Sequence, residues 1–104
     1  MAVVIVATIF PAPEHREEVI AALEATAEVV HASEDGCLLY AMHEGPDGRL
    51  VMIEKYADQA AVDAHLKGDG LSALSAEIKG KLAQPVDLQL LAPHTAGSPE
   101  KGAL

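Results

Sequence analysis

A nearly unbroken run of small and β-branched apolar residues from Ala2 to Phe10 places the strongest constraint on the fold. The run lacks polar alternation, which predicts a strand covered on both faces. Pro11 and Pro13 end the strand, and Pro13 suits the first turn of a helix, where a backbone N–H is not needed. A chain of 104 residues fits one domain. The layers that cover the two faces of this strand must therefore be built from a few helices and strands, or in part from a second copy of the chain.

Helical and strand patterns alternate along the rest of the chain. The first helix is expected to stop near Ser33, and Gly36 has the freedom to take a positive φ where the next strand starts. Asp58 is expected to cap a second helix, which the Gly-Asp-Gly sequence at positions 68–70 breaks. The expected elements are a helix, two strands, a helix in two segments and a final strand: Pro13–His31, Cys37–His43, Leu50–Tyr56, residues 58–66 and Leu71–Leu82, and Val86–Leu91.

The sequence Gly45-Pro46-Asp47-Gly48 predicts a tight connection between the two middle strands. Pro followed by Asp suits a type I turn, and Gly48 fits the left-handed position that completes a bulged hairpin. Such a turn decides which residues lie opposite one another. It predicts three pairs on one face of the sheet: Tyr40 with Glu54, Met42 with Met52, and Leu38 with Tyr56. The other face would carry Leu39, Ala41, His43, Val51, Ile53 and Lys55.

The order strand, helix, strand, strand, helix, strand is the ferredoxin-like split βαβ arrangement. It predicts an α+β sandwich in which helices cover one face of a four-stranded antiparallel sheet. Because the strands are apolar on both faces, we expect a second copy of the chain to cover the other face in a homodimer. Residues 1–92 would form this single domain. Residues 93–104 are rich in Pro, Gly, Ser, Thr and Ala, and we expect them to form a flexible tail.

The net charge of −9, from 16 acidic and 7 basic residues, argues against two classes of partner. Nucleic acid and anionic membrane surfaces both need clustered Lys and Arg. No apolar run approaches the ~20 residues that span a bilayer, and the N-terminus has no positively charged leader pattern. We therefore expect a cytoplasmic protein.

Three polar side chains lie inside or beside apolar stretches, namely Tyr40, Glu54 and His65. A buried polar group without a partner costs roughly 1–3 kcal/mol, so each needs a partner or a wet cavity. Glu54 would lie at an exposed strand end or in a cavity that raises its pKa. His65 would be a surface or helix-capping residue, or would lie beside a pocket. A bond between Tyr40 and Glu54 could brace the hairpin or serve a site. The three meet only if Tyr40 and Glu54 face the helices.

Other motifs that carry chemistry are missing. The histidines and the one cysteine have no zinc-site spacing, so no metal is expected. No Gly-rich phosphate loop and no nucleophile elbow occurs. Cys37 has no activating neighbour in sequence, which favours a packing role.

The motifs Glu34-x-Gly36-Cys37-x-x-Tyr40 and Glu54-x-Tyr56, followed by His65 on a helix, resemble those of the antibiotic biosynthesis monooxygenase (quinol monooxygenase-like) domains. That family commonly has Trp at the position of Tyr56. The resemblance implies a dimeric α+β barrel in which two sheets pack together. It also implies cofactor-independent oxidation of a quinol or phenolic polyketide-like substrate by dioxygen. His65 would be the base or hydrogen-bond partner, and Glu54 and Tyr40 would orient the substrate. The hairpin residues expected to bind it are Tyr56, Met42, Met52 and Leu38.

A second hypothesis is a non-catalytic dimer of the same fold that binds a small molecule. A roomy cavity in contact with His65 would favour the enzyme. A cavity filled by Met42, Met52 and Tyr56 would favour the binding protein.

Overall fold

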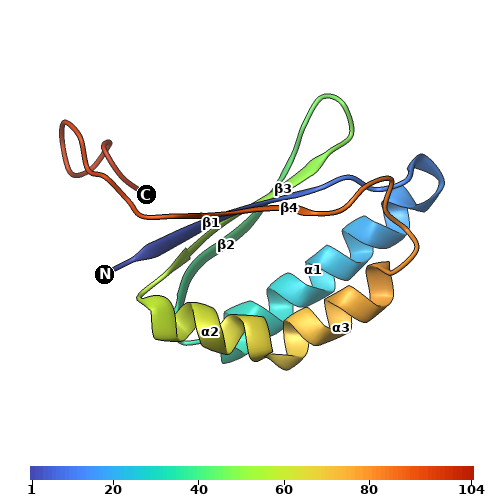
Figure 1. Ribbon diagram of the computed structural model, residues 1–104, viewed down its shortest axis with the longest axis horizontal. Coiled ribbons are helices and arrows are strands. Elements are labelled where there is room, and N and C mark those ends of the chain that lie inside the picture. The colour runs from blue at the N-terminus through green and yellow to red at the C-terminus, as the bar shows by residue number, and fades with distance from the viewer.

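Four antiparallel strands form one sheet with all helices on one face in the computed structural model, which describes residues 1–104 (Figure 1). The strand order is β2-β3-β1-β4, so the run that opens the chain is an inner strand. This arrangement confirms the predicted ferredoxin-like α+β fold. The elements are β1 (Val3–Ile9), a 3-10 turn η1 (Pro13–His15), α1 (Arg16–Ser33), β2 (Cys37–Glu44), β3 (Leu50–Tyr56), α2 (Gln59–Lys67), α3 (Asp69–Ile78) and β4 (Asp87–Leu91).

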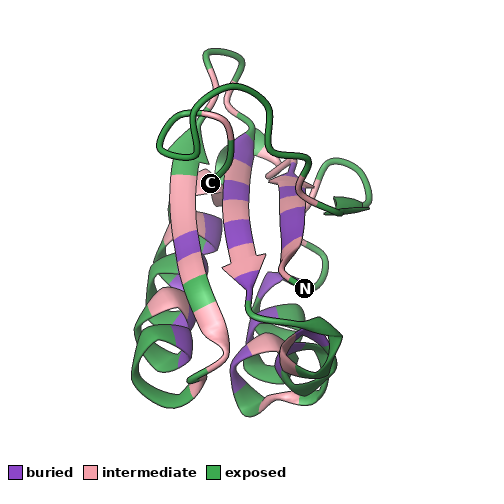
Figure 2. Ribbon diagram, turned by 90° about the vertical axis from the view of Figure 1, so that its left-hand side faces the viewer, coloured by how far each residue is buried: buried purple, intermediate pink, exposed green.

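The inner strands β1 and β3 alternate between a buried face and a partly exposed face (Figure 2). The buried face packs against the helices and includes Ile5, Leu50 and Met52, each at most 1% exposed. The open face carries partly exposed apolar residues on β1 and β3, among them Val6 and Ile53, which lie opposite one another. The helices therefore cover only one side of the sheet within a single chain.

The hairpin follows its turn chemistry, with one correction. Gly48 has φ of 91°, in the left-handed region as predicted. Tyr40 lies opposite Glu54 and Met42 opposite Met52, so these pairs are confirmed. The predicted pairing of Leu38 with Tyr56 is wrong, because a bulge between Cys37 and Leu39 places Cys37 opposite Tyr56 instead. The side chain of Leu38 is left 57% exposed.

Gly36 has a different role from the one predicted. Its φ is not positive. Instead, a Cβ atom at position 36 would lie 2.5 Å from the Cβ of Ala61 on α2, which is too close for two carbon atoms. Glycine is thus required because α2 packs directly against the start of β2.

The second helical region also differs in part from expectation. The Asp58 side chain accepts a hydrogen bond of 2.9 Å from the backbone of Ala61, which confirms the predicted cap. The predicted break at 68–70 is shorter, because α3 starts at Asp69 directly after Gly68. The predicted continuation to Leu82 is wrong, since α3 ends at Ile78 and Gly80 has φ of 78°. Leu82 instead forms an isolated bridge with Pro11.

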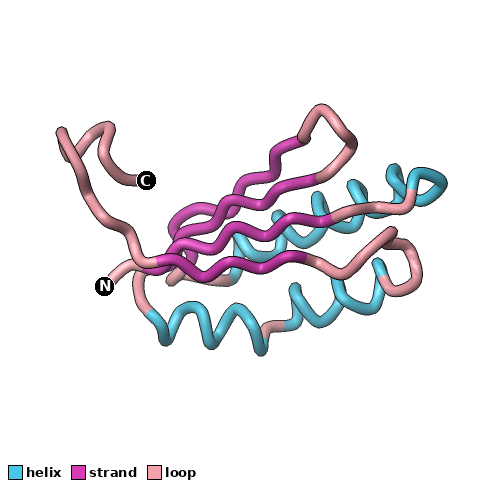
Figure 3. Tube along the Cα trace, turned by 45° about the horizontal axis from the view of Figure 1, so that its top comes forward, coloured by secondary structure: helices cyan, strands magenta, loops and turns pink.

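The edge strand β4 lies beside β1, and the helices run beneath the sheet (Figure 3). Residues 92–104 contain no helix or strand, and Lys55 Nζ donates a hydrogen bond to a main-chain oxygen of Leu104. None of the helices combines the length and apolar character required to cross a membrane.

Candidate functional site

A cavity of about 310 Å³ lies between the sheet and the helices α2 and α3, where the three polar candidates were predicted to meet. Most of its wall is apolar, and β1, β3, α3 and the region of β4 all contribute to it. Tyr40, Glu54 and His65 also line it. The prediction that these three face the helices and share one cavity is confirmed, while their catalytic roles remain predictions. Other lining residues include the apolar Ile5, Met52, Leu71, Leu74 and Leu88 and the polar Ser75.

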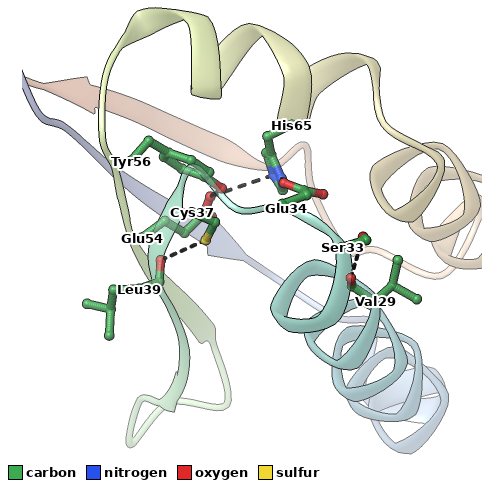
Figure 4. Close-up of polar contacts among 8 residues, drawn as sticks. All are labelled: Val29, Ser33, Glu34, Cys37, Leu39, Glu54, Tyr56 and His65. Atoms are coloured by element: carbon green, nitrogen blue, oxygen red, sulfur yellow. Dashed lines mark hydrogen bonds and ion pairs between the residues drawn. The ribbon is translucent and has the colours of Figure 1, made fainter.

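His65 is buried on α2 with 3% of its surface exposed, so the surface reading of this histidine is wrong. Its Nδ1 lies 2.7 Å from Oε1 of Glu34. Its Nε2 lies 3.8 Å from Oε1 of Glu54, which is longer than a hydrogen bond. The ring packs between two tyrosines, with centroid distances of 5.5 Å to Tyr40 and 5.1 Å to Tyr56. Figure 4 shows the imidazole between the two carboxylates.

Glu54 is 4% exposed and accepts a hydrogen bond of 2.6 Å from the hydroxyl of Tyr56. Burial raises the pKa of Glu54 above its ordinary value, although the Tyr56 hydroxyl and the charge of His65 oppose this shift. The predicted partner of Glu54 was Tyr40, its neighbour across the hairpin. The actual partner is two residues along the same strand and on the same face.

Tyr40 is 5% exposed, and its hydroxyl makes no hydrogen bond within the chain. No fully buried side-chain oxygen or nitrogen lacks a partner, so this hydroxyl remains accessible from the cavity that Tyr40 lines. Burial and the nearby Glu54 carboxylate raise the pKa of Tyr40, which keeps the phenol neutral. Tyr40 is therefore a free hydrogen-bond donor and acceptor in an apolar setting.

Of the four residues predicted to bind substrate, only Met52 lines the cavity. Tyr56 is fully buried behind it and is bonded to Glu54. Met42 lies outside the lining, partly buried against the core. Leu38 points away at the bulge, so its predicted place in the site is wrong. The cavity is consequently not filled by Met42 or Tyr56. Residues of α3 and β4 form much of its wall, which analysis of the hairpin alone missed.

Glu34 is the polar residue that sequence reasoning missed. It is the C-cap residue of α1, and its backbone N–H bonds to the carbonyl of Val30 at 3.0 Å. Its carboxylate reaches His65, which is 31 positions later in the chain. The only signal in the sequence was its place in the Glu34-x-Gly36-Cys37 motif.

The remaining polar groups add little to the site. Cys37 donates through Sγ to the carbonyl of Leu39 at 3.4 Å, and burial raises the pKa of the thiol. A raised pKa makes the nucleophilic thiolate scarce, as expected of a packing residue. No group of three or more His, Cys, Asp or Glu side chains is placed to hold a metal ion. The chemistry available to the cavity is proton transfer and hydrogen bonding.

Comparison with known proteins gives consistent matches. The sequence model of the family described as "Antibiotic biosynthesis monooxygenase" matches residues 2–77. A protein of Mycobacterium tuberculosis named "Putative monooxygenase Rv0793" is 34% identical over 92 residues, which cover 88% of this chain and 90% of that protein.

Solved structures agree with these sequence matches. The structure of Rv0793 superposes with a TM-score of 0.87 at 31% identity, covering 94% of this chain and 100% of the other. A Caulobacter crescentus structure described as "a putative antibiotic biosynthesis monooxygenase" gives a TM-score of 0.83 at 26% identity, covering 86% of this chain and 87% of that one. With its fold, its motifs and these relatives in agreement, the chain belongs to the antibiotic biosynthesis monooxygenase family.

Proposed function

We propose that this protein is a monooxygenase that oxidises a neutral phenol or quinol with dioxygen in the cavity between the sheet and α2. The observation that carries this proposal is one cluster of acid, imidazole and phenol in a space whose other lining residues are apolar except for Ser75. The cavity volume of about 310 Å³ is at the small end of the range for small-molecule sites, about 300–1,000 Å³. A compact aromatic substrate suits that size.

The charges around the cavity favour a neutral substrate. Glu54 lines the cavity and Glu34 lies directly behind His65, while no Lys or Arg side chain contributes to the wall. An anionic substrate would therefore meet carboxylates without a compensating cation. A phenol hydroxyl instead finds the free hydroxyl of Tyr40 and the ring of His65.

The proposed reaction begins when Nε2 of His65 takes the proton of the substrate hydroxyl. Tyr40 orients the resulting phenolate, whose electron-rich ring passes electrons to dioxygen. A C–O bond forms at a ring carbon that carries hydrogen, the O–O bond breaks, and this carbon loses its hydrogen. One oxygen atom remains as the second carbonyl of a quinone, and the other leaves as water with the two hydrogens lost by the substrate. The substrate supplies all four electrons, so this scheme needs no external reductant.

Oxygen uptake tests this function most directly. The full chain is given a panel of naphthalene and anthracene phenols and hydroquinols, and autoxidation without protein is subtracted. We expect protein-dependent uptake, with one labelled oxygen atom in the product when ¹⁸O₂ is supplied. His65→Ala should abolish uptake, whereas His94→Ala, which removes an exposed histidine that follows β4, should not. Uptake that is equal in wild type and His65→Ala would contradict the proposal.

A non-catalytic binding protein is the second candidate. One observation favours it, because Glu54 and Nδ1 of His65 already have partners within the chain, as in a purely structural network. Saturable binding of the panel compounds without any oxygen uptake would support this alternative.

A further inference from the structure

We propose that Glu34 is a positioning residue that holds His65 as its Nδ1–H tautomer, so that Nε2 is the ring nitrogen that gains and loses protons in the cavity. The role in catalysis rests on the proposed function, but the tautomer itself does not.

The two carboxylates beside the imidazole differ in their distance from the ring nitrogens and in their ability to accept a hydrogen bond from the ring. Oε1 of Glu34 lies 2.7 Å from Nδ1, within hydrogen-bond range, whereas Oε1 of Glu54 lies 3.8 Å from Nε2. Oε1 of Glu54 already accepts the hydroxyl of Tyr56. Because burial also favours the neutral form of Glu54, it is the weaker acceptor. A ring N–H is therefore placed on the side of Glu34.

Packing prevents the ring from exchanging its two nitrogens by a flip. Tyr40 and Tyr56 contact the imidazole, with interplanar angles of 57° and 42°. His65 is 3% exposed, so a flip would need both aromatic neighbours to move. The orientation in which Nδ1 faces Glu34 and Nε2 lies toward Glu54 is consequently fixed.

The Glu34 carboxylate lies where α2 ends and α3 begins. Its Oε2 is 3.5 Å from where a Cβ of Gly68 would lie, and Gly68 caps the C-terminus of α2. The dipole of α2 disfavours negative charge at that point, whereas the dipole of α3, whose N-cap is the same Gly68, favours it. The carboxylate is held there, with 16% of its side chain exposed, by its bond to His65. The two helix dipoles oppose one another at Gly68, so the hydrogen bond to His65 is the specific contact that fixes the carboxylate.

Nitrogen NMR of the full chain tests the tautomer without a substrate. Long-range ¹H–¹⁵N spectra distinguish Nδ1–H, Nε2–H and doubly protonated rings, and a His65→Gln sample identifies the His65 signals among the five histidines. Spectra are recorded with rising pH until one ring nitrogen loses its proton. We expect Nδ1 to keep the proton and Nε2 to lose it. A wild-type ring that keeps its proton on Nε2 would overturn the proposal.

Three variants separate positioning from bulk charge. Glu34→Ala should lower the ratio of Nδ1–H to Nε2–H by roughly tenfold or more, because a hydrogen bond to a charged group is lost. Glu34→Gln keeps an acceptor oxygen and should restore most of the ratio. Asp35→Asn changes the charge of the exposed neighbouring residue and should leave the ratio unchanged. An unchanged ratio in Glu34→Ala would also overturn the proposal, and if that variant fails to fold, the wild-type spectrum and Glu34→Gln still decide.

Activity then provides a separate readout. If the proposed oxidation is confirmed, Glu34→Ala should reduce kcat with little change in KM, and Glu34→Gln should recover part of the loss. If no phenol is oxidised, the NMR result still confirms or overturns the tautomer. The failure of the function and the failure of the positioning role are thus distinguishable.

Discussion

The hydroxyl of Tyr56 donates a hydrogen bond of 2.6 Å to Oε1 of Glu54, two residues earlier on the same strand. Both side chains are buried on the helix-facing side of β3. The second tyrosine on this side of the sheet, Tyr40, has a free hydroxyl. The two tyrosines therefore differ in what their hydroxyl groups do for the fold.

Replacing each tyrosine by phenylalanine should reveal this difference. Tyr56→Phe removes the donor to a buried carboxyl group, and we expect a loss of about 1–3 kcal/mol in the free energy of unfolding. Tyr40→Phe removes a hydroxyl without a partner in the chain and should cost no more than about 0.5 kcal/mol. Urea unfolding of both variants measures the two values. Equal losses in the two variants would show that the hydrogen bond from Tyr56 to Glu54 does not contribute to the free energy of unfolding.

Glu54→Gln should change how stability depends on pH. Burial raises the pKa of Glu54 above its ordinary value of 4.5, so the folded protein binds this proton more tightly than the unfolded chain. The stabilisation of the folded state by this tighter proton binding is fully present below pH 4.5. It is lost as the pH rises through the raised pKa of Glu54. Glutamine cannot ionise and still accepts from Tyr56, so the variant lacks this loss.

The free energy of unfolding of both proteins is measured from about pH 4 to pH 8, and at each pH the value for Glu54→Gln is subtracted from that for the wild type. We expect this difference to decrease as the pH rises. Carboxyl groups with lowered pKa, such as Glu18 and Asp47, give the opposite slope, but they are present in both proteins and cancel. A difference that increases with pH would contradict a raised pKa.

Gly36→Ala should destabilise the protein by about 1–3 kcal/mol, because the new methyl group would overlap the Cβ of Ala61. Ala61→Gly removes that Cβ at a cost of about 1 kcal/mol for a glycine inside a helix. If the two positions are in contact, the double variant should be more stable than the sum of the single losses predicts. Additive losses would show that the destabilisation by Gly36→Ala does not come from contact with the Cβ of Ala61.

The open face of the sheet should bind a second copy of the chain. Ile53 lies on this face between Val6 and Ala41, and all three side chains are only partly buried. Light scattering should give about twice the chain mass of 10.9 kDa, and Ile53→Glu should shift the protein toward monomer. Ala25→Glu, an equal change of charge on the exposed side of α1, should not. A stable wild-type monomer at micromolar concentration would contradict this interface.

The hairpin was predictable because its information is local. The Gly-Pro-Asp-Gly turn determines the register, and the register places Tyr40 opposite Glu54. The first helix and the Asp58 cap follow from equally local chemistry. These features account for most of the fold and for the side of the sheet on which the polar cluster lies.

The rest depends on contacts between distant segments. The bond between Glu34 and His65 joins residues 31 positions apart, and the motif that contains Glu34 does not identify His65 as its partner. The role of Gly36 arises from the approach of Ala61 on another helix. Gly70 was read as part of a helix break, but its lack of a side chain suits it to a buried position in α3 beside Val29.

The bulge at Leu38 gives the spacing of the Gly-Cys-x-x-Tyr motif a geometric meaning. In a regular strand, two residues three positions apart point to opposite faces. Cys37 packs against the core and Tyr40 lines the cavity, both on the helix side, because Leu38 is an extra residue that swings outward. The separation of three positions between Cys37 and Tyr40 therefore requires a bulge in the strand if both side chains are to lie on one face. Removing Leu38 would straighten the strand and leave Cys37 and Tyr40 two positions apart, still on one face of the sheet, whereas a regular strand that kept Leu38 would place them on opposite faces.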